Sequence, residues 1–476
     1  MQKRYSHLEE YKWSCNLYVP DNPDRSMTGN VEYTPGKGVT FEILISDFNL
    51  IENLKSIEVL HGISIEFGRF SLLKCLYLSS EGTGNLSKLR FHARLVIFGD
   101  FFDLNTSFDS LRFGLIGLDQ FCEEFNRVNT KNSFEHSFLS GDYSDAKLSI
   151  KKTNYSGPSV GKKNVLDEFY FRPSSEKISN EELGKKLSML NEDIFNALQG
   201  DDGYINVIKK EDPVYEVFLD SLKDCSYEKL FRHVNGLNNL FSILLLRPSY
   251  FTHLNVYKKN SSNKTASFPI LMSSHFDEKG IEKSKNNKKP FLKISSRDIC
   301  GCFQVVLDSW QELSTSLDLT LNVISQHIKG YDYNVVQHSV VCISALEQWY
   351  SRFEGSEPKN HYDFMIGKYA TEEMKKKLEE FIPLKIKVDD AGKLSYGASL
   401  TSIRGVILHP KKVRGVTFKD DRKVKELTEF DLYNLTEVII MILIRALYTK
   451  FGISESHLNT YFGSEGAEVL CEHTKV

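Results

Sequence analysis

The stretch 429-EFDLYNLTEVIIMILIRALYTKF-451 decides what the C-terminal part of the chain forms. Its unbroken apolar run, residues 438–444, lies between Glu437 and Arg445. A helix that spans a membrane needs about 20 apolar residues. This shorter run therefore predicts a helix that is buried inside a protein core. Gly452 predicts where the helix stops, because glycine commonly follows the last residue of a helix.

Upstream of this stretch, apolar residues recur at the spacing of a helix face. This spacing predicts further helices at residues 303–328, 335–353, 372–381 and 400–408. Helices that follow one another with short connections pack as a bundle. We therefore predict an all-α helical bundle and place it at residues 330–476.

The N-terminal part has a different pattern. Short runs rich in β-branched and aromatic residues are separated by Gly, Asn, Asp and Ser. These runs predict strands at residues 39–45, 57–67, 72–78 and 86–98. Several short strands in succession indicate a sandwich or a barrel-like module. We place a β-rich domain at residues 1–145.

Residues 146–329 mix the two patterns. A polar segment rich in Gly and Ser comes first, and helical patterns follow at residues 180–198 and 230–246. Pro248 stops the second of these helices. The chain is therefore predicted to be an α+β protein with three parts: a β-rich N-terminal domain, a mixed middle region and a C-terminal helical bundle.

Composition excludes some classes of protein. The 476 residues include 60 Lys and Arg against 63 Asp and Glu, a net charge of −3. This balance rules out a protein that coats nucleic acid with uniform positive charge, but it leaves room for a local basic site. The first residues, MQKRYSHLEEYKW, lack the apolar core of a secretory signal, and the eight Cys show no disulfide framework. We expect a cytoplasmic protein with reduced thiols and no membrane span.

The common templates for catalysis and metal binding are not met. Residues 157–163 place three residues between two glycines where a phosphate-binding P-loop has four, and Lys replaces the final Ser or Thr. Cys300 and Cys302 have no second Cys or His pair at a spacing that suits zinc. The Asp pairs at residues 389–390 and 420–421 stand in polar segments, where solvated carboxylates are the rule. The sequence predicts no metal site and no cofactor.

An Arg followed by a His after four to six residues occurs at Arg247–His253 and at Arg404–His409. The spacing alone does not choose between them, because chance produces such pairs in a chain of this length. Arg247 closes an apolar helix before Pro248, and His253 follows in a β-like run. A cation at the C-terminal end of a helix is commonly structural, so we predict a structural role for this pair.

Arg404 and His409 have different surroundings. An apolar helical stripe runs through this segment and comprises Leu400, Ile403, Val406 and Ile407. Arg404 lies between the stripe positions, and His409 falls at the predicted end of the helix before Pro410. Three basic residues follow at once: Lys411, Lys412 and Arg414. Such a cluster suits the phosphate backbone of RNA, and the alternative is a solvated basic loop with a capping His.

The sequence resembles the ApeA-like HEPN family, whose helical nuclease module carries an Arg and a His at this spacing. ISALEQWY at residues 343–350 resembles the helix before that motif, and LYTKFGI at residues 447–453 resembles the closing helix. Four N-terminal stretches recur there in the same order: TGNVEY (28–33), IEVLHG (57–62), RLVIFGDFF (94–102) and FGLIGLDQF (113–121). Three positions differ from the family pattern: Gly405 replaces Asn or Asp, Pro410 replaces a small residue, and Phe121 replaces Trp.

The resemblance implies a metal-independent endoribonuclease that acts as a toxin in abortive anti-phage defence. The 2′-OH of the RNA would attack the phosphate and give a 2′,3′-cyclic phosphate and a 5′-OH. The residue types agree with this chemistry. His409 can act as general base or acid near neutral pH, and Arg404 offers a charged planar fork to the phosphate. For Glu347 two interpretations stay open: it orients Arg404 or His409, or it is a surface acid of its helix.

The resemblance also implies partners. RNA, with tRNA one candidate, is the expected substrate. Two motifs would share one cleft in a homodimer or a higher homo-oligomer, and a phage protein is a candidate trigger. The alternative, from another class of function, is an HEPN fold that has lost activity and binds RNA or senses phage.

Overall fold

The computed structural model describes the parts of the chain that position the candidate site. These are residues 5–46, 49–83, 86–119, 121–122, 137–153, 169–173, 205–209, 214–220, 222, 225–259, 264–272, 294–316, 318–329, 334–355, 361–381, 395–408 and 428–463. The predicted helix at residues 180–198 and the loop at residues 157–163 lie outside them.

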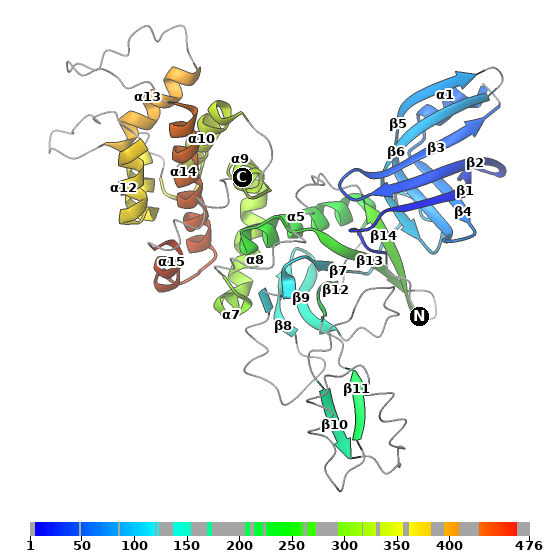
Figure 1. The fold of residues 1–476 in the computed structure, drawn as a ribbon, viewed down its shortest axis with the longest axis horizontal. Helices are drawn as coiled ribbons and strands as arrows, with labels where there is room; N and C mark the ends of the chain where they lie inside the picture. The colour runs from blue at the N-terminus through cyan, green and yellow to red at the C-terminus, as the bar shows by residue number, and fades with distance from the viewer. Residues whose placement is uncertain are drawn as a thin grey trace, which may run out of the picture.

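Strands make up most of the N-terminal half (Figure 1). They are β1 (Tyr11–Val19), β2 (Asn22–Thr34), β3 (Gly38–Ile45), β4 (Val59–Ser64), β5 (Gly68–Thr83), β6 (Leu86–Phe98), β7 (Ser110–Leu115), β8 (Ser137–Tyr143), β9 (Ala146–Thr153), β10 (Phe169–Pro173), β11 (Ile205–Lys209), β12 (Val214–Asp220), β13 (Phe251–Lys259) and β14 (Thr265–Met272). The helices are α1 (Asn49–Lys55), α5 (Tyr227–Leu245), α7 (Ser296–Ile299), α8 (Phe303–Ser316), α9 (Asp318–Lys329), α10 (Val335–Phe353), α11 (His361–Tyr369), α12 (Glu372–Phe381), α13 (Tyr396–Leu408), α14 (Glu429–Lys450) and α15 (Glu455–Phe462).

The first six strands form a closed antiparallel ring. They pair in the order β3-β2-β1-β4-β5-β6, and β3 also pairs with β6. Along the first nine residues of β6, buried residues alternate with more exposed ones, so one face of this part of the strand points into the ring. Phe41 and Phe91 stack there with ring centroids 5.0 Å apart. The prediction of a barrel-like N-terminal module is confirmed.

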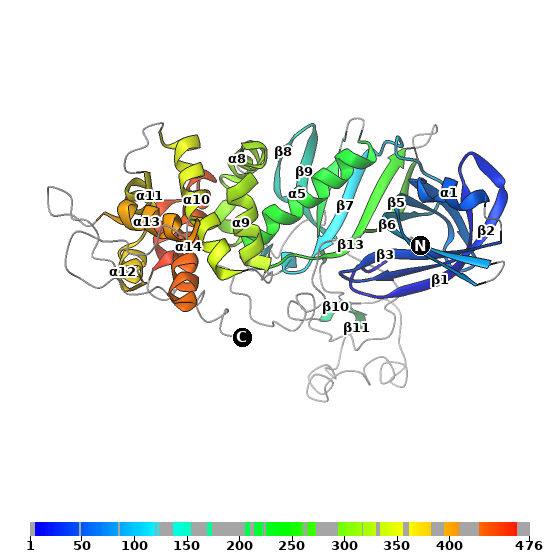
Figure 2. The ribbon, with the colours of Figure 1, turned by 90° about the horizontal axis from the view of Figure 1, so that it is seen from above.

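The remaining strands extend this ring into an open sheet. From β6 the order continues β14-β13-β7-β12-β9-β8, and a separate hairpin pairs β10 with β11. Helix α5 lies across the open sheet (Figure 2), where Leu237, Leu240 and Leu244 are fully buried. Its apolar face covers the sheet, and the C-terminal end of the helix contacts the C-terminal helices.

The C-terminal helices pack around α14. Buried residues lie on every side of this helix from Leu432 to Tyr448, as expected for a helix inside a core. Thr428 and Asp431 form a capping box at its start, and Gly452 follows its end with a φ of +80°. The buried hydroxyl of Tyr448 donates to the carbonyl oxygen of Ile243 on α5 at 2.7 Å.

One hydrophobic core continues from the open sheet through α5 into these helices. A second core fills the closed ring.

The domain boundaries at 145/146 and 329/330 stay predictions. The arrangement of strands followed by helices confirms the predicted α+β class.

The helices differ from the predictions at several places. The helix predicted at residues 303–328 is two helices, α8 and α9. At the end of α8, the hydroxyls of Ser314, Thr315 and Ser316 donate to carbonyl oxygens of the preceding turn. These hydroxyls compete with the backbone N–H groups for the carbonyl oxygens, which weakens a helix. Four short helices were not predicted: α1, α7, α11 and α15. Helix α11 follows a polar stretch of sequence and is only nine residues long.

None of the helices within the described residues combines the length and the apolar character that crossing a membrane requires.

Candidate active site

Arg404 lies on α13 at the edge of an apolar helix face. Leu400 and Ile403 are buried, and Ile407 packs partly buried against the core, so these positions anchor the helix as predicted. The side chain of Val406 lies outside the described residues. The side chain of Arg404 is 30% exposed, so its guanidinium reaches the surface beside the core.

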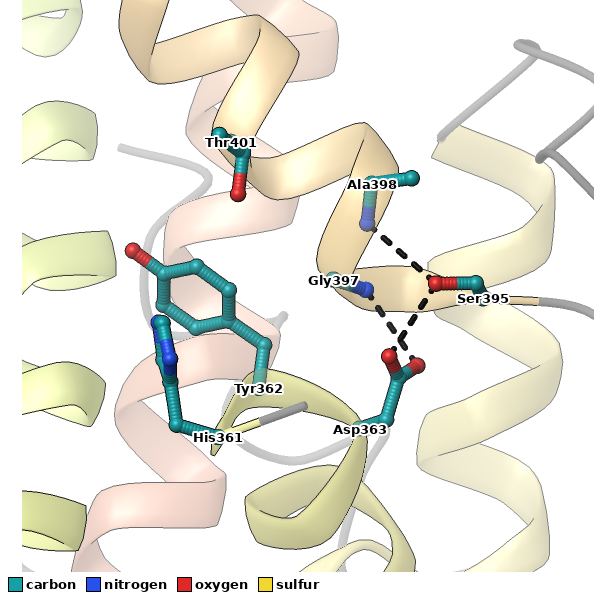
Figure 3. A pocket seen from close by; sticks show the side chains of 7 residues that line it. All are labelled: His361, Tyr362, Asp363, Ser395, Gly397, Ala398 and Thr401. Carbon is teal, nitrogen blue, oxygen red and sulfur yellow. Dashed lines mark hydrogen bonds between the residues drawn. The ribbon is translucent and has the colours of Figure 1, made fainter. Parts of the chain in front are cut away.

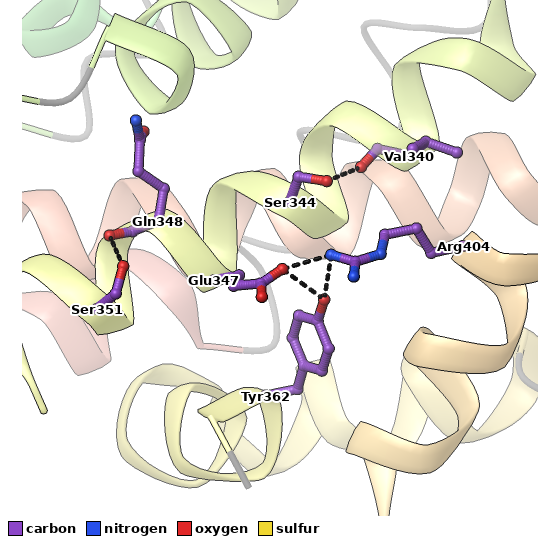
Figure 4. Close-up of polar contacts among 7 residues, drawn as sticks. All are labelled: Val340, Ser344, Glu347, Gln348, Ser351, Tyr362 and Arg404. Carbon is purple, nitrogen blue, oxygen red and sulfur yellow. Dashed lines mark hydrogen bonds and ion pairs between the residues drawn. The ribbon is translucent and has the colours of Figure 1, made fainter. Parts of the chain in front are cut away.

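Three side chains from three helices meet at this point (Figure 4). Nη1 of Arg404 donates to Oε2 of Glu347 on α10 and, at 3.2 Å, to the hydroxyl of Tyr362 on α11. The Tyr362 hydroxyl donates in turn to Oε2 of Glu347 at 3.4 Å. We call these three residues the Arg404 cluster. The structure therefore brings together two of the predicted site residues, Arg404 and Glu347.

The charge states in the Arg404 cluster follow from burial and from the ion pair. Burial by itself would lower the pKa of Arg404, but the hydrogen bond that its guanidinium donates to Glu347 and the charges of Tyr362 and Glu347 raise that pKa above its usual value. Burial, followed by the charge of Glu347, raises the pKa of Tyr362 to about 12. The guanidinium is therefore charged and the phenol neutral across the physiological pH range.

Asp363 fixes the start of α13 on α11. Its Oδ1 accepts hydrogen bonds from the backbone N–H of Tyr396 at 2.6 Å and of Gly397 at 3.2 Å. Its Oδ2 accepts from the Ser395 hydroxyl at 3.1 Å. A carboxylate here satisfies N–H groups that have no partner inside the helix. A Cβ at position 397 would lie 2.7 Å from Oδ2, so glycine permits this close approach.

The remaining predicted site residues lie outside the described part of the chain. They are His409, Lys411, Lys412 and Arg414. Their roles stay predictions.

The other Arg–His pair lies in the sheet region. Nε2 of buried His253 on β13 is 2.5 Å from Oε1 of buried Glu216 on β12. Between those strands runs β7, and a Cβ at Gly114 would lie 2.6 Å from the His253 ring. Arg247 lies against Gly117, where a Cβ would be 2.5 Å from Nη2. Both side chains make interior contacts, and their structural role stays a prediction.

Within the described ranges, no group of three or more His, Cys, Asp or Glu side chains is arranged to hold a metal ion. Cys300 and Cys302 are free thiols. The Asp pairs at residues 389–390 and 420–421 lie outside those ranges.

Sequence reasoning missed Tyr362 and Asp363. Both belong to the short helix α11 and stand 42 and 32 residues from their partners Arg404 and Ser395. No motif links such separated positions. A signal was present only in the amphipathic pattern of α11, where Tyr362, Ile366 and Tyr369 are buried.

The fold and the Arg404 cluster define an α+β protein in which strands occupy the N-terminal half and a polar cluster lies among C-terminal helices. The chain matches the family described as ApeA N-terminal domain 1 over residues 11–310. The chain belongs to this family and is an ApeA-like anti-phage protein. The match ends within α8, so the Arg404 cluster lies beyond it. No curated protein and no solved structure matches the chain.

Proposed function

We propose that the C-terminal helices form an HEPN-type endoribonuclease that cleaves RNA without a metal ion, as the toxic effector of abortive anti-phage defence. The observation that carries the proposal is the Arg404 cluster. It places a guanidinium between a carboxylate and a hydroxyl, near the end of the helix that leads directly to His409.

The Arg404 cluster leaves the guanidinium able to bind a phosphate. Both contacts of Arg404 use Nη1, whereas an arginine also carries donors on Nη2 and Nε. A planar fork with several donors matches the oxygens of a phosphate. Arg404 would stabilise the negative charge that grows on the phosphate in the transition state.

Glu347 has the contacts of a positioning residue. Its carboxylate and the Tyr362 hydroxyl approach the same nitrogen of Arg404, which restricts the rotation of the guanidinium. Holding a group in its productive orientation accelerates a reaction by reducing the entropy lost at the transition state. We assign to Glu347 the orientation of Arg404, the first of the two roles that the sequence left open.

His409 supplies the proton transfers in this proposal. It takes the proton of the RNA 2′-OH as that oxygen bonds to phosphorus, and the departing 5′-oxygen receives a proton from a His of the same cleft. The products are a 2′,3′-cyclic phosphate and a 5′-OH. A homodimer or higher homo-oligomer would bring two Arg–His motifs to one cleft. Lys411, Lys412 and Arg414 would contact the RNA backbone, and a phage protein would be the trigger.

One observation favours the alternative, an inactive RNA-binding or phage-sensing protein. The Glu347 carboxylate already neutralises Arg404. If the pair never opens, the phosphate meets no free positive charge there. The two proposals differ in whether RNA is cut.

The test compares cells that carry the wild-type chain, Arg404→Ala or His409→Ala during phage infection. RNA-end sequencing should show new 2′,3′-cyclic phosphate and 5′-OH ends with the wild type. Both variants should lose these ends and the defence while unfolding at the wild-type temperature, because the Arg404 side chain is partly exposed and the sequence places His409 at the polar end of its helix. Arg352→Ala, on the exposed side of α10, is the matched control and should behave as the wild type.

The outcomes separate the proposals. Purified protein incubated with lysate of infected cells should cut RNA in EDTA. A strict Mg²⁺ requirement with 3′-OH products would contradict the mechanism. Cleavage by His409→Ala, together with its loss in His253→Ala, would show that the other Arg–His pair is the catalytic one. RNA that is bound by the wild type but left intact would establish the alternative.

A further inference from the structure

A depression of about 300 Å³ lies between α11 and α13, beside the Arg404 cluster (Figure 3). Its lining comprises His361, Tyr362, Asp363, Ser395, Gly397, Ala398 and Thr401. Every one of these residues belongs to α11, to α13 or to the residue that precedes α13. The depression is therefore a feature of how these two helices pack.

The depression and the Arg404 cluster share a side chain. The hydroxyl of Tyr362 accepts from Nη1 of Arg404 at 3.2 Å, and the same residue lines the depression. Thr401, which points toward Tyr362 in Figure 3, precedes Arg404 by three residues on α13. Residues three apart lie on the same side of a helix. A molecule bound to Arg404 can therefore extend into the depression.

The lining decides which part of an RNA fits. It contains one carboxylate, from Asp363, and no Lys or Arg among the residues that line it, so a second phosphate would be repelled. It offers the partly exposed ring of His361, which packs against the buried ring of Tyr362 with the centroids 3.9 Å apart. A flat, neutral group with N–H donors suits this lining, and an RNA base has those properties.

Asp363 retains capacity for one more donor. Its Oδ1 accepts two hydrogen bonds from backbone N–H groups, whereas its Oδ2 accepts one, from Ser395. Each carboxylate oxygen can accept two. Because the first three bonds hold the carboxylate in place, an incoming N–H group meets an acceptor whose position is already fixed.

We propose that this depression is a base-binding subsite, an inference that rests on the proposed ribonuclease function. It binds the base next to the cleaved phosphate, against the ring of His361, with an amino group of the base donating to Asp363. Adenine, cytosine and guanine each present such an amino group. Uracil presents its N3–H between two carbonyl oxygens, which the carboxylate repels. The subsite therefore prefers a base with an amino group over uracil.

The test measures binding apart from cleavage. Fully 2′-O-methylated eight-residue oligomers of A, C and U cannot be cut, because their attacking hydroxyl is blocked. Fluorescence anisotropy with the purified wild-type chain should give dissociation constants about tenfold lower for the A and C oligomers than for the U oligomer. Asp363→Asn should reduce this difference, because the new amide donates to the carbonyl oxygens of uracil.

A second variant fills the depression and does not depend on the α13 cap. Thr401 is exposed, so Thr401→Trp should fold normally and bind the A and C oligomers about tenfold more weakly. Thr460→Trp, at an exposed position of α15, is the matched control and should leave binding unchanged. Equal affinity of the wild type for all three oligomers, or unchanged binding by Thr401→Trp, would overturn the subsite.

The same experiment distinguishes the two proposals from each other. A base preference in binding, without any cleavage of RNA that has free 2′-OH groups, would reject the ribonuclease and keep the subsite. Cleavage that depends on Arg404 and His409 but shows no base preference would reject the subsite alone.

Discussion

In the proposed ribonuclease, Glu347 and the phosphate of the substrate would compete for the guanidinium of Arg404. The side chains of Arg404 and Glu347 are 30% and 43% exposed, and ion pairs in such positions contribute about 0–1 kcal/mol. Hydrogen bonds between charged groups of an enzyme and its ligand contribute about 1.5–3 kcal/mol. A phosphate can therefore displace or share the Glu347 contact. Under this proposal, the ion pair would orient Arg404 without preventing substrate binding.

Tyr362→Phe tests the contribution of the hydroxyl in this arrangement. The change removes one polar atom that contacts both Arg404 and Glu347 and keeps the buried ring. RNA cleavage should fall about tenfold, the effect of roughly one hydrogen bond, while the free energy of unfolding stays close to that of the wild type. The measurement is the cleavage rate of both proteins from pH 6 to pH 9.

The ratio of the two rates should not change with pH. Burial and the charge of Glu347 raise the pKa of Tyr362 to about 12, so the hydroxyl keeps its proton over the whole range. A rate ratio that changes between pH 6 and pH 9 would mean that Tyr362 titrates, and equal rates would mean that its hydroxyl is dispensable.

At the scale of elements, α13 contains two glycines with opposite roles. A Cβ at Gly405 would meet nothing within 4 Å, whereas one at Gly397 would lie 2.7 Å from Oδ2 of Asp363. Gly405→Ala should raise the free energy of unfolding by about 0.5–1 kcal/mol, because alanine loses less backbone entropy in a helix. Gly397→Ala should lower it by about 1 kcal/mol by disturbing the cap.

Urea unfolding of the two variants and the wild type measures this difference. Gly367→Ala, on α11 with open space around the new Cβ, is a further control and should behave like Gly405→Ala. If Gly397→Ala were as stable as Gly405→Ala, the Asp363 cap would have no energetic role.

Elements with strong periodicity could be predicted from the sequence, and the contacts between them could not. The helix bounds of α10 agree with the prediction, because Asn334 caps its start and a regular apolar face runs along it. Helix α11 was not predicted, because a short helix has too few turns to show a clear periodicity. Its residues Tyr362 and Asp363 were therefore not recognised either. Arg404 was singled out by its spacing to His409, but its contact with Glu347 depends on how α10 and α13 pack.

At the scale of the whole molecule, the buried imidazole of His338 makes the free energy of unfolding depend on pH. His338 is 4% exposed, and burial, with the nearby His327, lowers its pKa from 6.5 to about 4. Between those values the unfolded chain binds a proton that the folded chain does not bind. The contribution that the neutral His338 ring makes to the free energy of unfolding is therefore fully present above about pH 6.5 and is lost as the pH falls toward 4. The loss for this residue is up to about 3 kcal/mol.

His338→Gln should flatten the acid limb of the stability profile. The variant removes the titrating ring, so its free energy of unfolding should fall less between pH 6.5 and pH 4 than that of the wild type. Thr460→Gln, at an exposed position of α15, changes no titratable group and should keep the wild-type profile. Denaturant titrations at several pH values give the comparison, and parallel profiles for all three proteins would contradict the assignment to His338.

The class of fold was accessible from the sequence because strand-like and helix-like patterns occupy different parts of the chain. The pairing of strands was not. Strand β14 pairs with β6 through Ile270 opposite Ile97, and alternation along a strand does not specify so distant a partner. Closure of the ring through β3 and β6 is likewise a property of the assembled sheet.

The hydrogen bond from Tyr448 to Ile243 lies inside the core that the open sheet and the helices share. This shared core limits which parts of the protein recombination can exchange. Here the apolar surface of the helices is completed by α5 and the sheet, so a transplanted helical region would arrive without part of its interior. We therefore expect the sheet and the helices to be exchanged as one unit, and a substitution in the α5 core face to require a matching one on α14.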